Sequence, residues 1–316
     1  MIEQIILGIV QGIVEWLPVS SEGLIFLIKT NFFPSQAGIK EIASQVLFLH
    51  LGTFLAALIY FWKDIVKLLI VIKEHFFSIK KIKEYKNSQE LKEKKEIKIL
   101  FFLVITTFIS GIFGFGLLII FDNLSSEIDN LTKFINIGIG SLLVITGLLQ
   151  IRSAKILKGF IKLNKNFDTN HKADQQENVS LKKDSFLQVE KKFFKLKLEK
   201  DIKNKDSVIL GFTQGFAALP GFSRSGLTVS ALLLRGFKKD IALKLSFLMS
   251  LPIVLAGNIV LNFDKFNLSL EAFLGLLMSF IFGYLTIGIL LKLANKINFG
   301  WFVFGFGILT VFSVFI

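Results

Sequence analysis

The 316-residue chain has no cysteine, only four prolines and only three histidines. Without cysteine, neither a disulfide nor a thiolate metal site can form. Because proline ends or kinks a helix, each of the four prolines marks a candidate helix end or kink. Charge is also scarce: 19% of the residues are charged, 53% are hydrophobic and the mean hydropathy is +0.64. This composition is typical of an integral membrane protein.

The net charge of +13 comes from two segments. Residues 63–98 contain 11 Lys and Arg against 6 Asp and Glu, and residues 152–205 contain 15 against 7. Elsewhere the two signs balance. A basic excess that is confined to loops between apolar stretches marks the cytoplasmic side of a membrane protein. We therefore place both segments in the cytoplasm and expect no nucleic-acid partner.

A single arginine interrupts the apolar run from residue 208 to residue 234. Residues 220–228 combine one proline, two glycines and three hydroxyl side chains with Arg224. A charged side chain at the bilayer centre costs roughly 2.5–3.5 kcal/mol on insertion scales, so we expect this arginine to belong to a functional site. Pro220 can end one helix and Ser223 can N-cap the next. The backbone N–H groups of Arg224, Ser225 and Gly226 would then converge beside the guanidinium, which suits a phosphate.

A weaker copy of this arrangement stands near the N-terminus. Residues 7–12 and 210–215 share the pattern Leu-Gly-x-x-Gln-Gly, and a proline and a serine-rich corner follow each one. We interpret the two copies as an internal repeat with a spacing of about 200 residues. The first copy contains a carboxylate, Glu15, and the second contains Arg224. If the two breaks meet, the two charges can satisfy each other and hold a ligand.

Each break interrupts a stretch that is otherwise apolar. Broken helices are tolerated at membrane depth where they line a polar cavity, so we expect re-entrant hairpins at 2–28 and 208–234. Six further apolar stretches have about the length of a membrane span. These spans are 46–62, 97–121, 134–151, 245–261, 272–291 and 299–316. The expected fold is all-α and integral to the membrane, with six transmembrane helices plus the two re-entrant helical hairpins.

The cytoplasmic placement of the basic segments sets the topology. The first hairpin must then enter the membrane from outside and the second from inside. Residues 1–151 form a first repeat, 152–205 a basic cytoplasmic insert, and 206–316 a second repeat of inverted topology. The tips of the two hairpins would meet near the midplane of the membrane.

The two breaks resemble the signature motifs of the undecaprenyl-diphosphatase family, the bacitracin-resistance phosphatases. The first motif is Gln-x-x-x-Glu-x-x-Pro-x-Ser-Ser-x-Gly at residues 11–23, and the second is Pro-Gly-x-Ser-Arg-Ser-x-x-Thr at residues 220–228. Similar context extends through residues 51–56, 61–62 and 247–252. The resemblance covers most of the apolar chain and mainly leaves out the lysine-rich insert.

The resemblance implies a hydrolase that converts undecaprenyl (polyprenyl) diphosphate to the monophosphate and so recycles the lipid carrier for cell-envelope glycan synthesis. It also implies a multi-pass protein of the cytoplasmic membrane, an active site that faces the outer side, and a divalent cation, Mg²⁺ or Ca²⁺. The expected partners are the polyprenyl diphosphate and membrane lipids. A second copy of the chain, in a homodimer, is a further candidate partner.

The family's functional residues can be carried onto this sequence. The catalytic roles fall on Glu15, Ser21 and Arg224, and the cation ligands on Glu15 and Gln11. Phosphate binding falls on Ser20, Gly221, Ser223, Ser225, Gly226 and Thr228. Two hydrolytic routes stay open, because either Ser21 or a water molecule could attack phosphorus after activation by Glu15.

Two departures from the family pattern bear on catalysis. Gln11 stands where the family often has Glu, and Leu24 stands where it usually has His. His50 could replace that histidine from the next helix, but we prefer a core histidine bonded to backbone. For Glu22 we prefer a helix-capping role, since it lies beside the predicted N-cap at Ser20 or Ser21. Because paired re-entrant hairpins also occur in transporters, a protein that binds or transports polyprenyl phosphates without hydrolysis is the alternative function.

Overall fold

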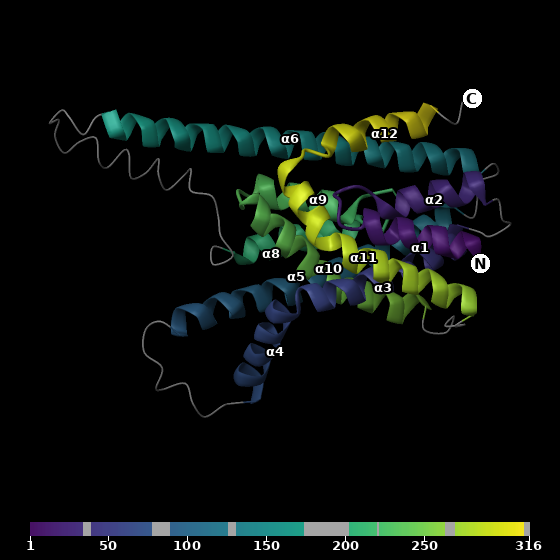
Figure 1. The fold of residues 1–316 in the computed structure, drawn as a ribbon, viewed down its shortest axis with the longest axis horizontal. Coiled ribbons are helices and arrows are strands. Elements are labelled where there is room, and N and C mark those ends of the chain that lie inside the picture. The colour runs from purple at the N-terminus through teal and green to yellow at the C-terminus, as the bar shows by residue number, and fades with distance from the viewer. Residues whose placement is uncertain are drawn as a thin grey trace.

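The structure, a computed structural model, describes residues 1–33, 39–77, 89–125, 131–173, 202–219, 221–262 and 269–312. These residues form eleven helices, most of which lie alongside one another (Figure 1). Four helices in the described part of the chain are long and apolar enough to cross a membrane: Glu96–Ile120, Ile137–Gly159, Lys239–Val260 and Leu270–Ala294. The chain therefore has the all-α fold of a multi-pass membrane protein.

The first half of the chain contains six of the described helices and the second half contains five. The first six are α1 (Ile2–Val14), α2 (Ser21–Phe32), α3 (Ile39–Tyr60), α4 (Trp62–Phe77), α5 (Gln89–Ser125) and α6 (Leu131–Ala173). The remaining five are α8 (Asn204–Phe216), α9 (Arg224–Leu234), α10 (Lys239–Asn262), α11 (Leu270–Lys296) and α12 (Gly300–Phe312).

Four of the six predicted spans coincide with the four long apolar segments. The other two fall on shorter apolar helices, Ser44–Tyr60 within α3 and Gly300–Phe312, which is α12. The last four residues of the predicted span 299–316 lie outside the described residues.

Helix α6 is much longer than the predicted span 134–151, because it continues to Ala173. Ser153 and Leu157, one turn apart, are both buried beyond the end of that span. A packed face thus supports the helix where the apolar run has already ended, and the first part of the predicted insert is helical. Residues 174–201 of the insert lie outside the described residues.

Both predicted breaks are present and are built alike. Ser20 is the N-cap of α2 and Ser223 is the N-cap of α9, each with an extended backbone and a side-chain oxygen that accepts the N–H three residues further on, at 3.0 Å. This confirms the predicted N-cap at Ser223 and identifies Ser20, of the two candidates, as the cap of the first copy. Pro220, the predicted helix end in the second copy, lies outside the described residues.

Gly221 is required at the second break for two reasons. Its φ of +102° lies in the region that side chains other than glycine rarely adopt. A Cβ atom at this position would also lie only 2.8 Å from the Cα of Ile139 in α6. The turn that aims Arg224 therefore depends on this glycine.

The two halves interlock at their hairpins. Helix α1 packs along α11 and helix α8 packs along α5, so each hairpin packs against a long helix of the other half. Close approach depends on small residues: a Cβ on Gly12 would lie 2.8 Å from the backbone N of Gly283, and one on Gly211 would lie 2.7 Å from Cβ of Ile109. The pairs α3–α10 and α6–α12 also join the two halves.

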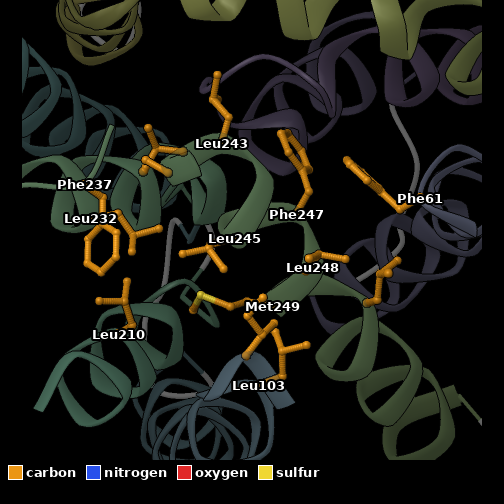
Figure 2. Close-up of a cluster of buried hydrophobic side chains, with 14 of the residues drawn as sticks. Phe61, Leu103, Leu210, Leu232, Phe237, Leu243, Leu245, Phe247, Leu248 and Met249 are labelled. Atoms are coloured by element: carbon orange, nitrogen blue, oxygen red, sulfur yellow. The ribbon is translucent and has the colours of Figure 1, made fainter. Parts of the chain in front are cut away.

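The larger cluster of buried apolar side chains gathers around α10 (Figure 2). Leu245 and Met249 are fully buried there, and the ring of Phe247 lies 5.5 Å from that of Trp16, which follows Glu15 in the first break. Helix α10 of the second half thus supplies the apolar support for the break in the first half.

The two hairpins open toward opposite ends of the helical bundle (Figure 1). At the open end of each hairpin, an ion pair joins its two helices. Lys29 of α2 lies 3.4 Å from Glu3 of α1, and Arg235 at the end of α9 lies 2.7 Å from the buried Asp206 of α8. The open end of the first hairpin also contacts α11, because the Met1 ammonium lies 3.4 Å from Glu271.

Candidate active site

The two breaks meet at an ion pair between Glu15 and Arg224. The side chain of Glu15 is only 7% exposed and that of Arg224 only 16%. Two such charges would each be costly in an apolar interior without the other. The prediction that the charges of the two repeat copies satisfy each other is confirmed.

Glu15 is the centre of a set of polar contacts. One carboxylate oxygen pairs with Arg224, and the other accepts hydrogen bonds from Gln11 Nε2 at 3.0 Å and from Ser21 Oγ at 2.9 Å. Gln11 lies one turn before Glu15, and Ser21 is the first residue of α2. The break therefore holds one hydroxyl directly against a carboxylate, which is the arrangement that activates a nucleophile.

His50 reaches the same carboxylate from α3. Its Nε2 lies 3.3 Å from Glu15 Oε2, and its Nδ1 lies 2.8 Å from the carbonyl oxygen of Val46. The preferred interpretation as a backbone-bonded core histidine was therefore incomplete, because the second ring nitrogen faces the site. Sequence spacing could not show this contact, since His50 and Glu15 lie on different helices.

Glu22 has the predicted position in the first turn of α2, where the helix dipole favours a carboxylate. The capping hydrogen bond itself comes from Ser20, not from Glu22. One oxygen of Glu22 also lies 3.9 Å from His50 Nε2, so this residue borders the site.

The hydroxyls of the second motif bind other protein groups: Ser225 joins the second break to the first, and Thr228 joins it to α10. Ser225 donates to the carbonyl of Leu17 at 3.1 Å, and the hydroxyl of Thr228 lies 2.7 Å from that of Ser246. We predicted that three backbone N–H groups would converge on a phosphate. At most two of them can do so, because the N–H of Gly226 already donates to the capping side chain of Ser223.

The backbone of the first break is fixed from two further directions. The indole N–H of Trp16 donates to the carbonyl of Gly283 in α11 at 2.9 Å, and Gln150 of α6 donates to the carbonyl of Pro18 at 2.5 Å. The carbonyl of Pro18, which the break leaves without a helical partner, is thereby satisfied within the protein, and the Trp16 side chain ties the break to α11. Helices of both halves thus position Glu15 and Ser21.

A pocket borders the ion pair between α3 and α10. Its lining residues are Glu15, Trp16, His50, Thr53, Phe54, Ala57, Arg224, Ser250, Leu251 and Val254. Arg224 Nη1 is buried and has no hydrogen-bond partner among the described residues. A guanidinium nitrogen in this state is available to an incoming oxyanion, and phosphate oxygens match its geometry.

The residues present fit a divalent cation only in part. The Oε1 atom of Gln11 is buried without a hydrogen-bond partner among the described residues, and it lies on the side chain that contacts Glu15. No group of three or more acidic, histidine or cysteine side chains in the described part of the chain has the arrangement of a metal site. One amide and one carboxylate oxygen suit a Mg²⁺ ion that takes its other ligands from phosphates and water.

Comparison with known proteins is consistent with this geometry. Residues 4–311 match the family model described as bacitracin resistance protein BacA. The undecaprenyl-diphosphatase of Methanococcoides burtonii is 34% identical over 99% of this chain and 98% of its own length. Those of Haloarcula marismortui (33% identical; 93% of this chain, 90% of the relative) and Methanothrix thermoacetophila (31%; 98% and 95%) are similarly related. The chain belongs to the bacitracin resistance protein BacA family.

Proposed function

We propose that the protein hydrolyses undecaprenyl diphosphate to the monophosphate and free phosphate. The observation that carries this function is the direct contact of Ser21 and Arg224 with Glu15, which joins a nucleophile, a base and a phosphate-binding cation from two distant motifs. The names of the relatives, all undecaprenyl-diphosphatase, support an enzyme over the binding or transport alternative.

In the mechanism that we propose, Arg224 binds the terminal phosphate and Ser21 attacks its phosphorus. The new bond joins phosphorus to Ser21 Oγ, the hydroxyl proton passes to Glu15, and the bond from phosphorus to the bridging oxygen breaks. The polyprenyl monophosphate leaves, and a water molecule then hydrolyses the phosphoserine. The 2.9 Å contact between Ser21 and Glu15 favours this route over direct attack by water.

His50 takes the place of the histidine that the family usually has at the position of Leu24. Its contact with the backbone of Val46 fixes the ring, so that Nε2 stays beside Glu15. We assign His50 the task of holding Glu15 in position and sharing its proton during the two steps.

A divalent cation would be held by Glu15 and Gln11. When bound, it would neutralise phosphate charge that Arg224 alone leaves uncompensated.

The arrangement of the helices supports an inverted repeat with re-entrant hairpins. Exchanging the two halves converts the pair α1–α11 into the pair α8–α5, and the hairpins open toward opposite ends of the bundle. We assign residues 1–151 and 206–316 to the two repeats and the basic segment 152–205 to the cytoplasm. The first hairpin then opens to the outer side.

We place the active site on the outer side of the cytoplasmic membrane. A line of polar contacts supports this placement: Ser44 bonds Asn262 at 2.5 Å, and Asn262 donates to Asn258 at 3.0 Å. Asn258 also donates to the carbonyl of Val254, which lines the pocket. This line follows the α3–α10 contact from the proposed outer end to the site. The apolar lining residues Phe54 and Leu251 would contact the first prenyl units.

The proposed function is tested by phosphate release from the purified protein in detergent. Undecaprenyl and dolichyl diphosphates serve as substrates, each with Mg²⁺, Ca²⁺ or a chelator. We expect release that depends on the cation, and its loss in Ser21→Ala. A wild-type protein that binds the lipid but releases no phosphate under any of these conditions would contradict the enzyme and support the binding or transport protein.

A further inference from the structure

Helix α4 does not take part in the site, and it is oriented differently from the helices around it. Figure 1 shows that it runs across the direction that the long helices share, beside one end of α5. Its inner face is anchored, because Leu68 and Val71 are buried and Asp64 forms an ion pair with Lys244 of α10 at 2.8 Å. A helix that is fixed across the spans lies along the membrane surface instead of crossing it.

The outer face of α4 is apolar. Trp62, Leu69 and Ile70 are 58%, 53% and 48% exposed. At helical spacing these three side chains lie within one third of the circumference, away from the buried Leu68 and Val71. An aromatic ring with a polar tip beside two aliphatic side chains matches the boundary between lipid headgroups and acyl chains.

A basic stripe borders this apolar face. Lys63 and Lys67 are both exposed and lie one turn apart on one side of α4. Lys73, also exposed, lies within the apolar face, six residues after Lys67. Its long side chain can extend so that the ammonium group reaches the headgroups. The apolar face and the cationic stripe together complement an acidic lipid surface.

From this arrangement we infer that α4 is an interfacial helix that binds the phosphate headgroups of acidic phospholipids through Lys63 and Lys67. The exposed Trp62, Leu69 and Ile70 insert among the acyl chains beside those headgroups. The occupant of this face is the membrane surface itself, not a water-soluble partner. This surface lies outside the catalytic machinery, so the inference does not depend on the proposed reaction.

The first test measures the depth of α4 in the membrane. Because the chain has no cysteine, Ile70→Cys and Lys67→Cys each introduce a single site for a spin label. In lipid nanodiscs, we expect the Ile70 label to be accessible to oxygen and protected from a water-soluble nickel reagent, and the Lys67 label to show the reverse. A label at residue 70 that the nickel reagent reaches freely would overturn the inference and leave the face to a soluble partner.

The second test measures lipid preference. Purified protein is incubated with equal amounts of phosphatidylglycerol and phosphatidylcholine, and bound lipid is counted by native mass spectrometry. We expect Lys63→Gln with Lys67→Gln to reduce the affinity of the α4 site for phosphatidylglycerol roughly fivefold for each lysine, with phosphatidylcholine unchanged.

The matched control is Lys155→Gln with Lys158→Gln. These lysines of α6 are also exposed, and their replacement changes the net charge by the same amount. An equal loss of phosphatidylglycerol in the control would mean that overall charge, not α4, sets the preference, and would overturn the inference. Unchanged phosphatidylglycerol binding in the α4 variant would overturn it as well.

Discussion

Arg224 donates a hydrogen bond to Glu15 although 209 positions separate them in the chain. Each residue comes from the broken helix of its own half, and neither half contains both charges at its break. The site therefore exists only where the two halves meet. It combines an arginine from one copy with a carboxylate and a serine hydroxyl from the other.

Arg224→Lys should lower phosphate release by about 10²–10³-fold, because lysine keeps the charge but loses the planar fork that binds phosphate through two nitrogens. The control is Arg152→Lys, at an exposed position on α6, which should leave the rate unchanged. Rates are compared by phosphate release in detergent. An Arg224→Lys enzyme as fast as wild type would show that the site lies elsewhere.

Glu15→Gln should be at least as damaging as the arginine substitution. Glutamine removes the base that Ser21 contacts and leaves Arg224 without its counter-charge. Glu22→Gln is the matched control, since Glu22 borders the site and, among the described residues, forms no hydrogen bond with Ser21 or Arg224. We expect the control to retain activity within severalfold of wild type; equal losses in both variants would argue against a special role for Glu15.

His50→Leu should reduce the rate by about 10²-fold, the lower end of what positioned acid–base groups contribute. Since His50 already contacts Glu15, Leu24→His alone should bring little gain. The same substitution in the His50→Leu background should restore part of the lost rate. A full rate for His50→Leu, with no response to Leu24→His, would confine His50 to the core role that its bond to Val46 suggests.

Single cysteines test the topology, because the natural chain has none. We expect Leu270→Cys, 66% exposed at the start of α11, to react with an impermeant thiol reagent in intact cells. Lys155→Cys, exposed at the other end of the bundle, should react only after the cells are opened. The opposite labelling pattern would reverse the proposed orientation and move the active site to the inner side.

Gly12→Ala should destabilise the protein by about 1–3 kcal/mol, because its Cβ would meet the backbone of Gly283 and Ser279 at 2.8 Å. Gly116→Ala is the control, since nothing lies within 4 Å of a Cβ at that position. Thermal unfolding in detergent should show a lower midpoint for the first variant and no decrease for the second. Equal midpoints would mean that α1 does not need close contact with α11.

Local features of the sequence predicted the two helix breaks well. The N-cap at Ser223 follows from a serine just after a helix break, as does the choice of Ser20 or Ser21 for the other cap. The pairing of Glu15 with Arg224 follows from the cost of leaving either charge alone in an apolar environment. These inferences depend on short-range chemistry or on the rarity of charge in membrane segments. For this reason they did not require knowledge of the helix packing.

Contacts between distant helices were harder to predict. His50 meets Glu15 only because α3 lies beside the first break, and no spacing in the sequence encodes that neighbourhood. The sequence does contain a signal for the tight α1–α11 and α8–α5 pairs, because Gly8 with Gly12 and Gly211 with Gly215 have the Gly-x-x-x-Gly spacing of close helix contacts. The extension of α6 was missed because burial continues on one face after the apolar run ends.

The packing of α1 along α11 also sets an order of events during biosynthesis. The first hairpin leaves the ribosome some 250 residues before its packing partner, a delay of roughly 10–50 s at ordinary rates of translation. Gln150, Arg224 and Gly283 are made in that order, so the polar atoms of the first break gain these partners one after another. The first hairpin therefore stays without its long packing partner through most of synthesis, and the site is complete only after α11 has been made.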